Sequence, residues 1–262
     1  MRKRAHVQCR ISDRLWSEVE RLIRADWSPE QVAWRLYKEQ GVCISHEWIY
    51  HYIYQDKAEG GDLYTHLRCQ KRHKKRYGQY DKRGKIVDRR GIEERPLIVE
   101  KNTRPGDWEG DTVEGSRHQG YLLTLVERRS RYLVSKHLAH KDAKTTSEAM
   151  ICSLDGHEVK TVTLDNGKEF SGHKEVSSGL DAYIYFADPY SSWQRGLNEN
   201  TNGLLRQYYP KGMSLKCIDE ERLEEVVSKL NNRPRKALGW KTPYEVMYNK
   251  VTILTSRVAI TS

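Results

Sequence analysis

The chain has 262 residues, of which 37% are hydrophobic and 31% are charged, and its formal net charge is +10 at pH 7. No run approaches the roughly 20 apolar residues of a membrane helix, and the five scattered cysteines do not form a disulfide framework, so we expect a cytoplasmic protein. Residues 1–104 hold 24 Lys and Arg against 15 Asp and Glu, whereas residues 105–262 hold 22 against 21. This asymmetry predicts that the first part binds a polyanion.

Three helical patterns open the chain. The first begins at Ser12, the second at the capping box that starts with Ser28, and the third at Ser45. Three short helices with a tight turn between the last two fit a helix-turn-helix, whose final helix lies in the major groove of DNA. A plain three-helix bundle has the same spacing. We predict two DNA contacts on the final helix, His46 and Trp48.

A basic segment follows. Residues 68–90 contain 11 Lys and Arg and only 2 acids, with tyrosines and glycines interspersed. Because this composition cannot build a core, it predicts a linker that is mobile in solution and orders on phosphates. A solvated charge run is the usual alternative, but the position after a DNA-binding module favours a clamp on the DNA backbone. The predicted phosphate contacts are Lys71, Arg72, Lys74, Lys75 and Arg76.

Strands and helices alternate from about residue 105 onward. Apolar runs between turn signals predict an antiparallel meander of three strands at 107–114, 120–126 and 131–138. A helix, a strand, a helix and a strand are predicted next, at 143–154, 159–164, 173–180 and 182–186. The pattern ends with three helices, at 198–207, at 219–232 and after the capping box that starts at Thr242.

Three acids have unusual settings on separate elements. Asp165 follows a buried strand and precedes an Asn-Gly turn, at the strand end where α/β sheets bind ligands. Asp111 lies in a strand beside Gly110, where acids are rare and glycine permits a close approach. Glu199 begins a helix with a polar face that a purely structural helix would not need. Any one of them is more simply a solvated acid, but together they predict a site.

Five motifs surround these acids: WEGDTVEG (108–115), TLVERRSRY (124–132), TLDNGKEF (163–170), DPYSSWQRGLNENTNGLLRQYYPKG (188–212) and LNNRPRKALGWKTPYEV (230–246). With them the chain resembles the IS30-type transposases of the DDE transposase and integrase superfamily. The resemblance implies that Asp111, Asp165 and Glu199 are the metal-binding acids and that Arg206 contacts a substrate phosphate. Ser192 and Leu164 depart from the family pattern without touching the acids.

The resemblance also implies an α/β fold. An RNase H-like catalytic core with a mixed five-stranded sheet and flanking helices is expected at 105–250, preceded by the all-α helix-turn-helix module at 1–59 and the basic linker at 60–104. A tail at 251–262 ends the chain. The strands of Asp111 and Asp165 are then neighbours, with the helix of Glu199 packed beside them.

The function implied by the resemblance is cleavage and joining of DNA strands at the ends of an insertion sequence. Two Mg²⁺ or Mn²⁺ ions are the expected cofactors, because in-line attack on a phosphodiester needs charge stabilisation at both oxygens and hard cations prefer carboxylates. The expected partners are double-stranded DNA, as inverted repeats and as target, and further copies of the chain on that DNA, in the bacterial nucleoid and away from membranes.

Two other functions remain open: a catalytically inactive DNA-binding remnant, and an RNase H-like nuclease that does not join strands. The intact acids argue against the first, and the basic N-terminal module argues against the second. We assign no zinc site to the Cys43/His46 and His66/Cys69 pairs, because paired CxxC ligands are missing. Family members carry a further helix-turn-helix module upstream, which we expect this chain to lack; its discrimination of transposon ends from random DNA should then be weak.

Overall fold

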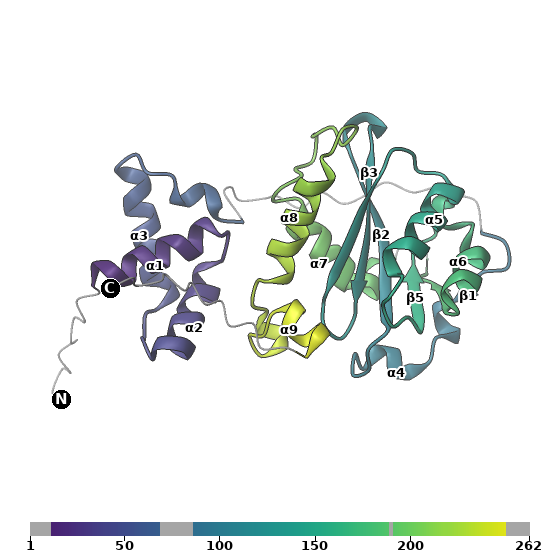
Figure 1. Cartoon of the computed structure of the whole chain (residues 1–262), viewed down its shortest axis with the longest axis horizontal. Coiled ribbons are helices and arrows are strands. Elements are labelled where there is room, and N and C mark those ends of the chain that lie inside the picture. Colours follow the sequence, from purple (N-terminus) through teal and green to yellow (C-terminus); the bar gives the residue numbers. More distant parts are fainter. Residues whose placement is uncertain (1–11, 69–85, 189–190, 250–262) are drawn as a thin grey trace, which may run out of the picture. The chain divides into compact units, whose positions relative to one another are not determined.

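The computed structural model of the chain describes residues 12–68, 86–188 and 191–249. The chain divides into two compact units, Met1–Arg76 and Tyr77–Ser262 (Figure 1). None of the described helices combines the length and the apolar character that crossing a bilayer requires. The five predicted phosphate contacts at 71–76 lie outside the described residues, so the basic clamp stays a prediction.

The first unit is helical, as the capping signals predict. Its helices are α1 (Asp13–Arg24), α2 (Pro29–Gln40), α3 (His46–Ala58) and the 3₁₀ turn η1 (Leu63–His66). The side chains of Ser12, Ser28 and Ser45 each accept a hydrogen bond from the backbone N–H three residues on, which confirms all three N-caps. Gly41 ends α2 in the left-handed conformation with φ of 66°.

The second unit is built on a six-stranded mixed sheet in the order β1-β6-β5-β2-β3-β4. The strands are β1 (Arg90–Gly91), β2 (Asp107–Glu114), β3 (Tyr121–Glu127), β4 (Leu133–Leu138), β5 (Thr161–Leu164) and β6 (Tyr183–Phe186). The predicted meander is confirmed, since β2, β3 and β4 pair antiparallel, and β5 and β6 extend the sheet in parallel from β2. This order and these directions make the fold RNase H-like.

The sixth strand, β1, comes from the segment that composition assigns to the linker. It pairs in parallel with β6, and Ile86 before it is buried in the core of the sheet. Arg95 after it is also buried, and it donates to the Thr163 hydroxyl and pairs with Glu100. The sheet therefore has one strand more than the predicted five, because part of this charged segment buries Ile86 and Arg95 against the core and pairs with β6.

Helices cover both faces of the sheet (Figure 1). Two of them, α5 (Ala143–Leu154) and α6 (His173–Leu180), share one apolar core with the sheet; α7 (Gly196–Leu205) and α8 (Glu220–Asn231) share a second. Side chains of β3 alternate between these cores: Leu123 and Leu125 belong to the first, Leu122 and Val126 to the second. Two short helices, α4 (Leu97–Glu100) and α9 (Pro243–Tyr248), complete the unit.

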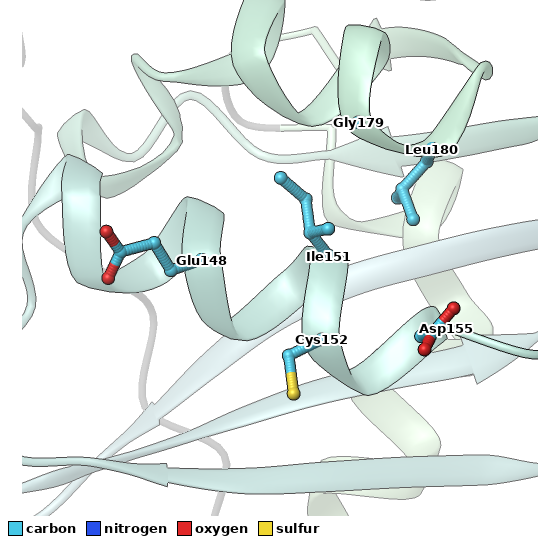
Figure 2. A pocket seen from close by; sticks show the side chains of 6 residues that line it. All are labelled: Glu148, Ile151, Cys152, Asp155, Gly179 and Leu180. Atoms are coloured by element: carbon cyan, nitrogen blue, oxygen red, sulfur yellow. The ribbon is translucent and has the colours of Figure 1, made fainter.

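The contact between α5 and α6 depends on a glycine. A Cβ on Gly179 would lie 2.7 Å from Cδ1 of Ile151, so α6 approaches α5 more closely than a larger residue would allow. Beside this contact is a pocket lined by Glu148, Ile151, Cys152, Asp155, Gly179 and Leu180 (Figure 2). The pocket belongs to the helical layer on the first core, on the opposite face of the sheet from α7.

One buried asparagine completes the edge of the sheet, and its removal should be costly. Asn231 accepts a hydrogen bond from the backbone N–H of Leu133 (2.9 Å) and donates one to its carbonyl (2.8 Å), in place of a neighbouring strand. We expect Asn231→Ala to lower the free energy of unfolding by about 2–4 kcal/mol, because two buried backbone groups lose their partners. Urea unfolding measures this. The neighbouring Asn232→Ala removes an amide that donates to Ser228 of the same helix and should change the free energy of unfolding by less than about 0.5 kcal/mol.

Candidate active site

The alternation of β2 directs two acids to the same face. Since Trp108 lies in the first core and Val113 in the second, the odd-numbered Glu109 and Asp111 face α7 with Val113. Gly110 faces the other way, and a Cβ there would lie 2.6 Å from Cδ2 of Leu164. The glycine thus permits the close approach of a core side chain of β5.

Asp111 and Asp165 lie at the same end of neighbouring parallel strands. Glu109 on β2 is opposite Thr163 on β5. Two residues further along, the first strand reaches Asp111 and the chain after the second reaches Asp165. Backbone N–H groups hold one oxygen of each: Thr112 donates to Oδ1 of Asp111 (2.8 Å) and Gly167 to Oδ1 of Asp165 (2.9 Å). The two Oδ2 atoms are left to face a common space.

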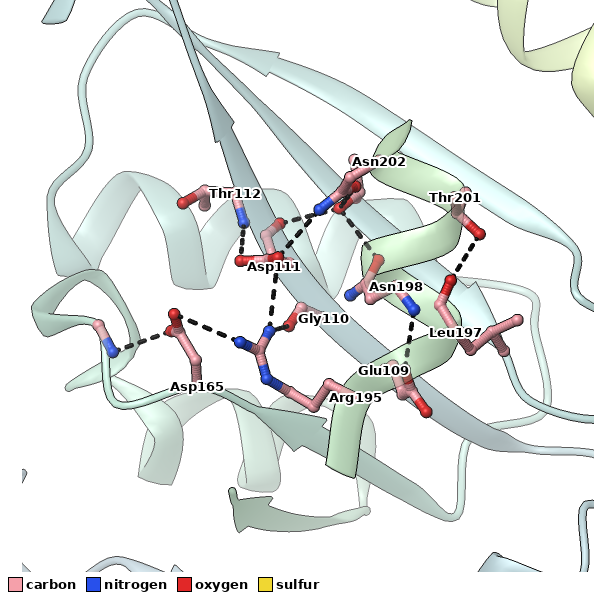
Figure 3. A network of polar contacts seen from close by, with 12 residues as sticks. Glu109, Gly110, Asp111, Thr112, Asp165, Arg195, Leu197, Asn198, Thr201 and Asn202 are labelled. Atoms are coloured by element: carbon pink, nitrogen blue, oxygen red, sulfur yellow. Dashed lines mark hydrogen bonds and ion pairs between the residues drawn. The ribbon is translucent and has the colours of Figure 1, made fainter. Parts of the chain in front are cut away.

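The guanidinium of Arg195 occupies that space (Figure 3). Its Nη1 is 3.5 Å from Oδ2 of Asp111 and its Nη2 is 3.7 Å from Oδ2 of Asp165. About a fifth of each acid side chain is exposed, 22% for Asp111 and 23% for Asp165. The arrangement is an acid pair, open to solvent on one side, with a cation between its members.

A chain of hydrogen bonds ties Asp111 to α7 (Figure 3). The side-chain amide nitrogen of Asn202 donates to Oδ2 of Asp111 (2.9 Å), and the side-chain oxygen Oδ1 of Asn202 accepts from the hydroxyl of Thr124 (3.0 Å). The same hydroxyl lies 3.3 Å from the side-chain oxygen Oδ1 of Asn198, a residue that is fully buried. The position of α7 on the sheet is thereby linked to the orientation of the Asp111 carboxylate.

The start of α7 is fixed by Glu109. One oxygen of this buried carboxylate accepts from the backbone N–H of Asn198 (3.0 Å), and the other is paired with the buried Arg128. Arg128 also donates to the carbonyl of Val99 (3.2 Å). Burial raises the pKa of the Glu109 carboxyl group, while Arg128 and the N–H of Asn198 oppose that rise. Glu109 is thus a structural acid that anchors the helix.

Burial likewise raises the pKa of the Asp111 carboxyl group, and the nearby charge of Asp165 raises it further. The strongest opposing influence is the positive charge of Arg195, followed by the N–H of Thr112 and the charge of Lys141. An acid pair in this setting therefore calls for a positive charge between the carboxylates.

Curated relatives of the chain are insertion-sequence transposases. The transposase of IS4351 from Bacteroides fragilis is 42% identical over 228 residues, which cover 86% of this chain and 70% of that protein. The transposase of IS1086 from Cupriavidus metallidurans is 36% identical over a match that covers 94% of this chain and 76% of that protein. The transposase InsI of IS30A from Escherichia coli is 37% identical over a match that covers 87% of this chain and 62% of that protein. The chain belongs to the IS30 family of transposases.

The other comparisons are weaker. No protein-family model matches the chain. Two solved structures with similar folds are a simian T-cell lymphotropic virus intasome (17% identity, TM-score 0.47, 60% of each chain) and the catalytic core of BIV integrase (20% identity, TM-score 0.43, 55% of this chain and 93% of that one).

Glu199, the third acid expected in the site of this IS30-family chain, does not lie between the other two acids as a shared ligand set would require. Glu199 lies on α7, which packs on the strand of Asp111, β2, as predicted, and also on β3, but its side chain is exposed. Among the described residues, no three His, Cys, Asp or Glu side chains lie close enough to hold a metal ion. Glu199 nevertheless shares a helical face with Asn202, three residues after it, and follows Arg195, which directly precedes α7, by four residues; both Asn202 and Arg195 contact Asp111.

The predicted DNA contacts outside the acids also differ in their surroundings. His46 and Trp48 are exposed on the first turn of α3, with 57% of Trp48 accessible. Arg206, by contrast, donates to the backbone carbonyls of Glu114 (2.8 Å) and Tyr209 (3.3 Å), and burial lowers the pKa of its guanidinium. Its role in this structure is to hold the end of α7 on β2.

Sequence reasoning missed Arg195 in this IS30-family site, and it did not foresee that Glu109 anchors α7. For Arg195 the available signal was its spacing, four residues before Glu199 and seven before Asn202 on one helical face. Glu109 carried the signal of a second acid at period two from Asp111 on the same strand. Neither spacing says which acid binds a ligand and which anchors a helix, since that depends on the neighbours that each one contacts.

Proposed function

We propose that this transposase cleaves DNA strands at the ends of its insertion sequence and joins them to target DNA, using two Mg²⁺ or Mn²⁺ ions held by Asp111, Asp165 and Glu199. The observation that carries the proposal is the acid pair at the ends of β2 and β5, whose Oδ2 atoms face a cation of the chain itself. A donor set of carboxylates that already accommodates one positive charge fits hard divalent ions.

When bound, the ions would stabilise negative charge on the attacking and the leaving oxygen of the phosphodiester. The chain's own residues orient the ligands: the N–H groups of Thr112 and Gly167 and the amide of Asn202 fix the rotation of the two aspartates. Glu109, by holding the first turn of α7, sets where Glu199 lies relative to Asp111. No serine, tyrosine or cysteine is needed as a covalent nucleophile, because water and then a 3′-hydroxyl attack.

DNA recognition is assigned to the other parts of the chain. We place base contacts on α3, through His46 and Trp48, and backbone contacts on the basic segment before the catalytic unit. Arg206 would reach a substrate phosphate only by giving up its two carbonyl partners. The partners would be inverted repeats and target DNA, bound by several copies of the chain in the cytoplasm, at the nucleoid.

The basic segment gives a prediction in the salt dependence of binding. Replacing Lys71, Arg72, Lys74, Lys75 and Arg76 with Gln should flatten the slope of log affinity against log salt by roughly 0.9 per lost phosphate contact. Base preference should survive. Fluorescence anisotropy with labelled duplex at four salt concentrations measures both. A control variant with Gln at two exposed bases of the catalytic unit, Lys216 and Arg222, should keep the wild-type slope, and an equal slope in all three proteins would mean that the segment is only solvated.

The function itself is tested by incubating the purified chain with end-labelled DNA that carries the element's terminal repeats, with Mg²⁺ or with EDTA. Cleaved and joined products that require Mg²⁺ are expected. Binding without cleavage would identify a DNA-binding remnant instead, and cleavage without joined products would identify a nuclease of RNase H type. Each outcome selects one of the three functions.

A further inference from the structure

Arg195 differs from the other arginines that pair with acids of the same strand. Arg104 binds Asp107 at the start of β2 through two short hydrogen bonds, 2.8 and 2.9 Å, in the usual bidentate geometry. The Arg195 nitrogens stay at 3.5 and 3.7 Å from the two aspartates, beyond the normal hydrogen-bond range of 2.7–3.2 Å. Its one hydrogen bond in the described part of the chain is a long one, 3.4 Å, to the carbonyl of Gly110.

The rest of the guanidinium is poorly satisfied as well. Its Nε is buried, and no hydrogen-bond partner for it is found among the described residues. Only 14% of the side chain is exposed, so water does not compensate fully. A buried donor without a partner is unfavourable. Arg195 is therefore held between the acids by charge and not by a set of specific hydrogen bonds, which makes the contact easy to exchange for another cation.

We propose that Arg195 is a positioning residue that takes the place of the metal between Asp111 and Asp165 until the first divalent ion displaces it. This inference rests on the proposed function, in which these two acids are metal ligands. Without a cation, the two carboxylates would repel each other across the site. With Arg195 seated, they keep the rotation that ligation requires, and the site is preorganised before DNA and metal arrive.

The same contact explains the position of Glu199. Arg195 immediately precedes α7, and Glu199 follows four residues later in the first turn of that helix. While the guanidinium fills the space between the two aspartates, it leaves no room there for the third carboxylate, which stays exposed. Departure of Arg195 removes the charge that the two aspartates share and makes room for a cation that all three acids can share.

The proposal predicts the sign of an effect on metal binding. Since a divalent ion must first displace the guanidinium, Arg195→Gln should tighten the binding of the first Mn²⁺ by about tenfold, which corresponds to about 1.4 kcal/mol. Arg195→Lys keeps the charge and should stay close to the wild type. Binding is measured on the full chain without DNA, from the loss of the free Mn²⁺ signal in electron paramagnetic resonance. In EDTA, Arg195→Gln should also lower the unfolding temperature by roughly 2–4 °C, and saturating Mg²⁺ should remove this difference.

Two further variants serve as controls for the Mn²⁺ measurement. Arg104→Gln breaks another arginine–aspartate pair of β2 and should leave Mn²⁺ affinity unchanged, although it destabilises the protein. Asp111→Asn should remove the binding. Unchanged or weaker Mn²⁺ binding in Arg195→Gln, with Asp111→Asn still abolishing it, overturns the role of Arg195 alone. Intact binding in Asp111→Asn overturns the metal site of the proposed function and the Arg195 inference together.

Discussion

Asp111→Asn, Asp165→Asn and Glu199→Gln are each expected to reduce strand cleavage and joining by at least roughly 1,000-fold, as loss of an essential catalytic group does. Each change keeps the shape of the side chain and removes one negative charge from the proposed metal site. DNA affinity should stay nearly intact, because recognition is assigned to the helical unit and the basic segment. Product analysis on end-labelled DNA with Mg²⁺ and a parallel binding isotherm measure the two effects.

The matched control is Glu114→Gln. Glu114 lies on the same strand as Asp111 but on the opposite face of the sheet, where it pairs with His118. The Glu114→Gln variant should cleave and join DNA strands like the wild type. Retained strand joining in any one of the three acid variants would remove that residue from the proposed ligand set, and Glu199, which is exposed in the structure, is the most informative of the three.

The largest effect on stability is expected from Arg128→Met. Arg128 is buried in the turn between β3 and β4 and pairs with Glu109. The other oxygen of Glu109 accepts a hydrogen bond from the N–H of Asn198. Removing one partner of a buried pair leaves an uncompensated charge, so the free energy of unfolding should fall by about 3–5 kcal/mol. Urea unfolding at about pH 8 measures it. The start of α7 should loosen at the same time.

The loss should depend on pH in a definite direction. Burial already raises the pKa of Glu109 in the folded protein, and loss of the Arg128 charge raises it further. A carboxyl group with a raised folded-state pKa contributes stability that is fully present below its unfolded pKa of about 4.3 and is lost as the pH rises through the folded pKa. The deficit of Arg128→Met relative to wild type should therefore shrink as the pH falls from about 8 toward 5.

The double variant Glu109→Gln/Arg128→Met is the control for this reading. It removes both charges, and the Gln carbonyl can still accept from the N–H of Asn198. Because no buried charge is left unpaired, it should recover at least half of the loss and show little dependence on pH in this range. A double variant as unstable as Arg128→Met would mean that the methionine is simply misfitted in its pocket.

Much of the fold followed from local patterns. Capping residues at Ser12, Ser28 and Ser45 and turn signals between apolar runs placed the helices and the three-stranded meander within a few residues, because caps and periodicity act over four or five residues of chain. The strand β1 was missed for the converse reason. Its two residues carry no periodicity, and its place depends on a parallel partner, β6, more than 90 residues away.

The acid site divides in the same way. The motifs of the sequence determined the family, and the resemblance to that family implied the RNase H-like fold with Asp111 and Asp165 on neighbouring strands. Only the tertiary structure decided that Glu109 anchors α7, that Arg206 binds carbonyls and that Arg195 lies between the two aspartates. The charges of these side chains can be read from the sequence, but their partners come from other elements, and burial and distance determine what each charge does.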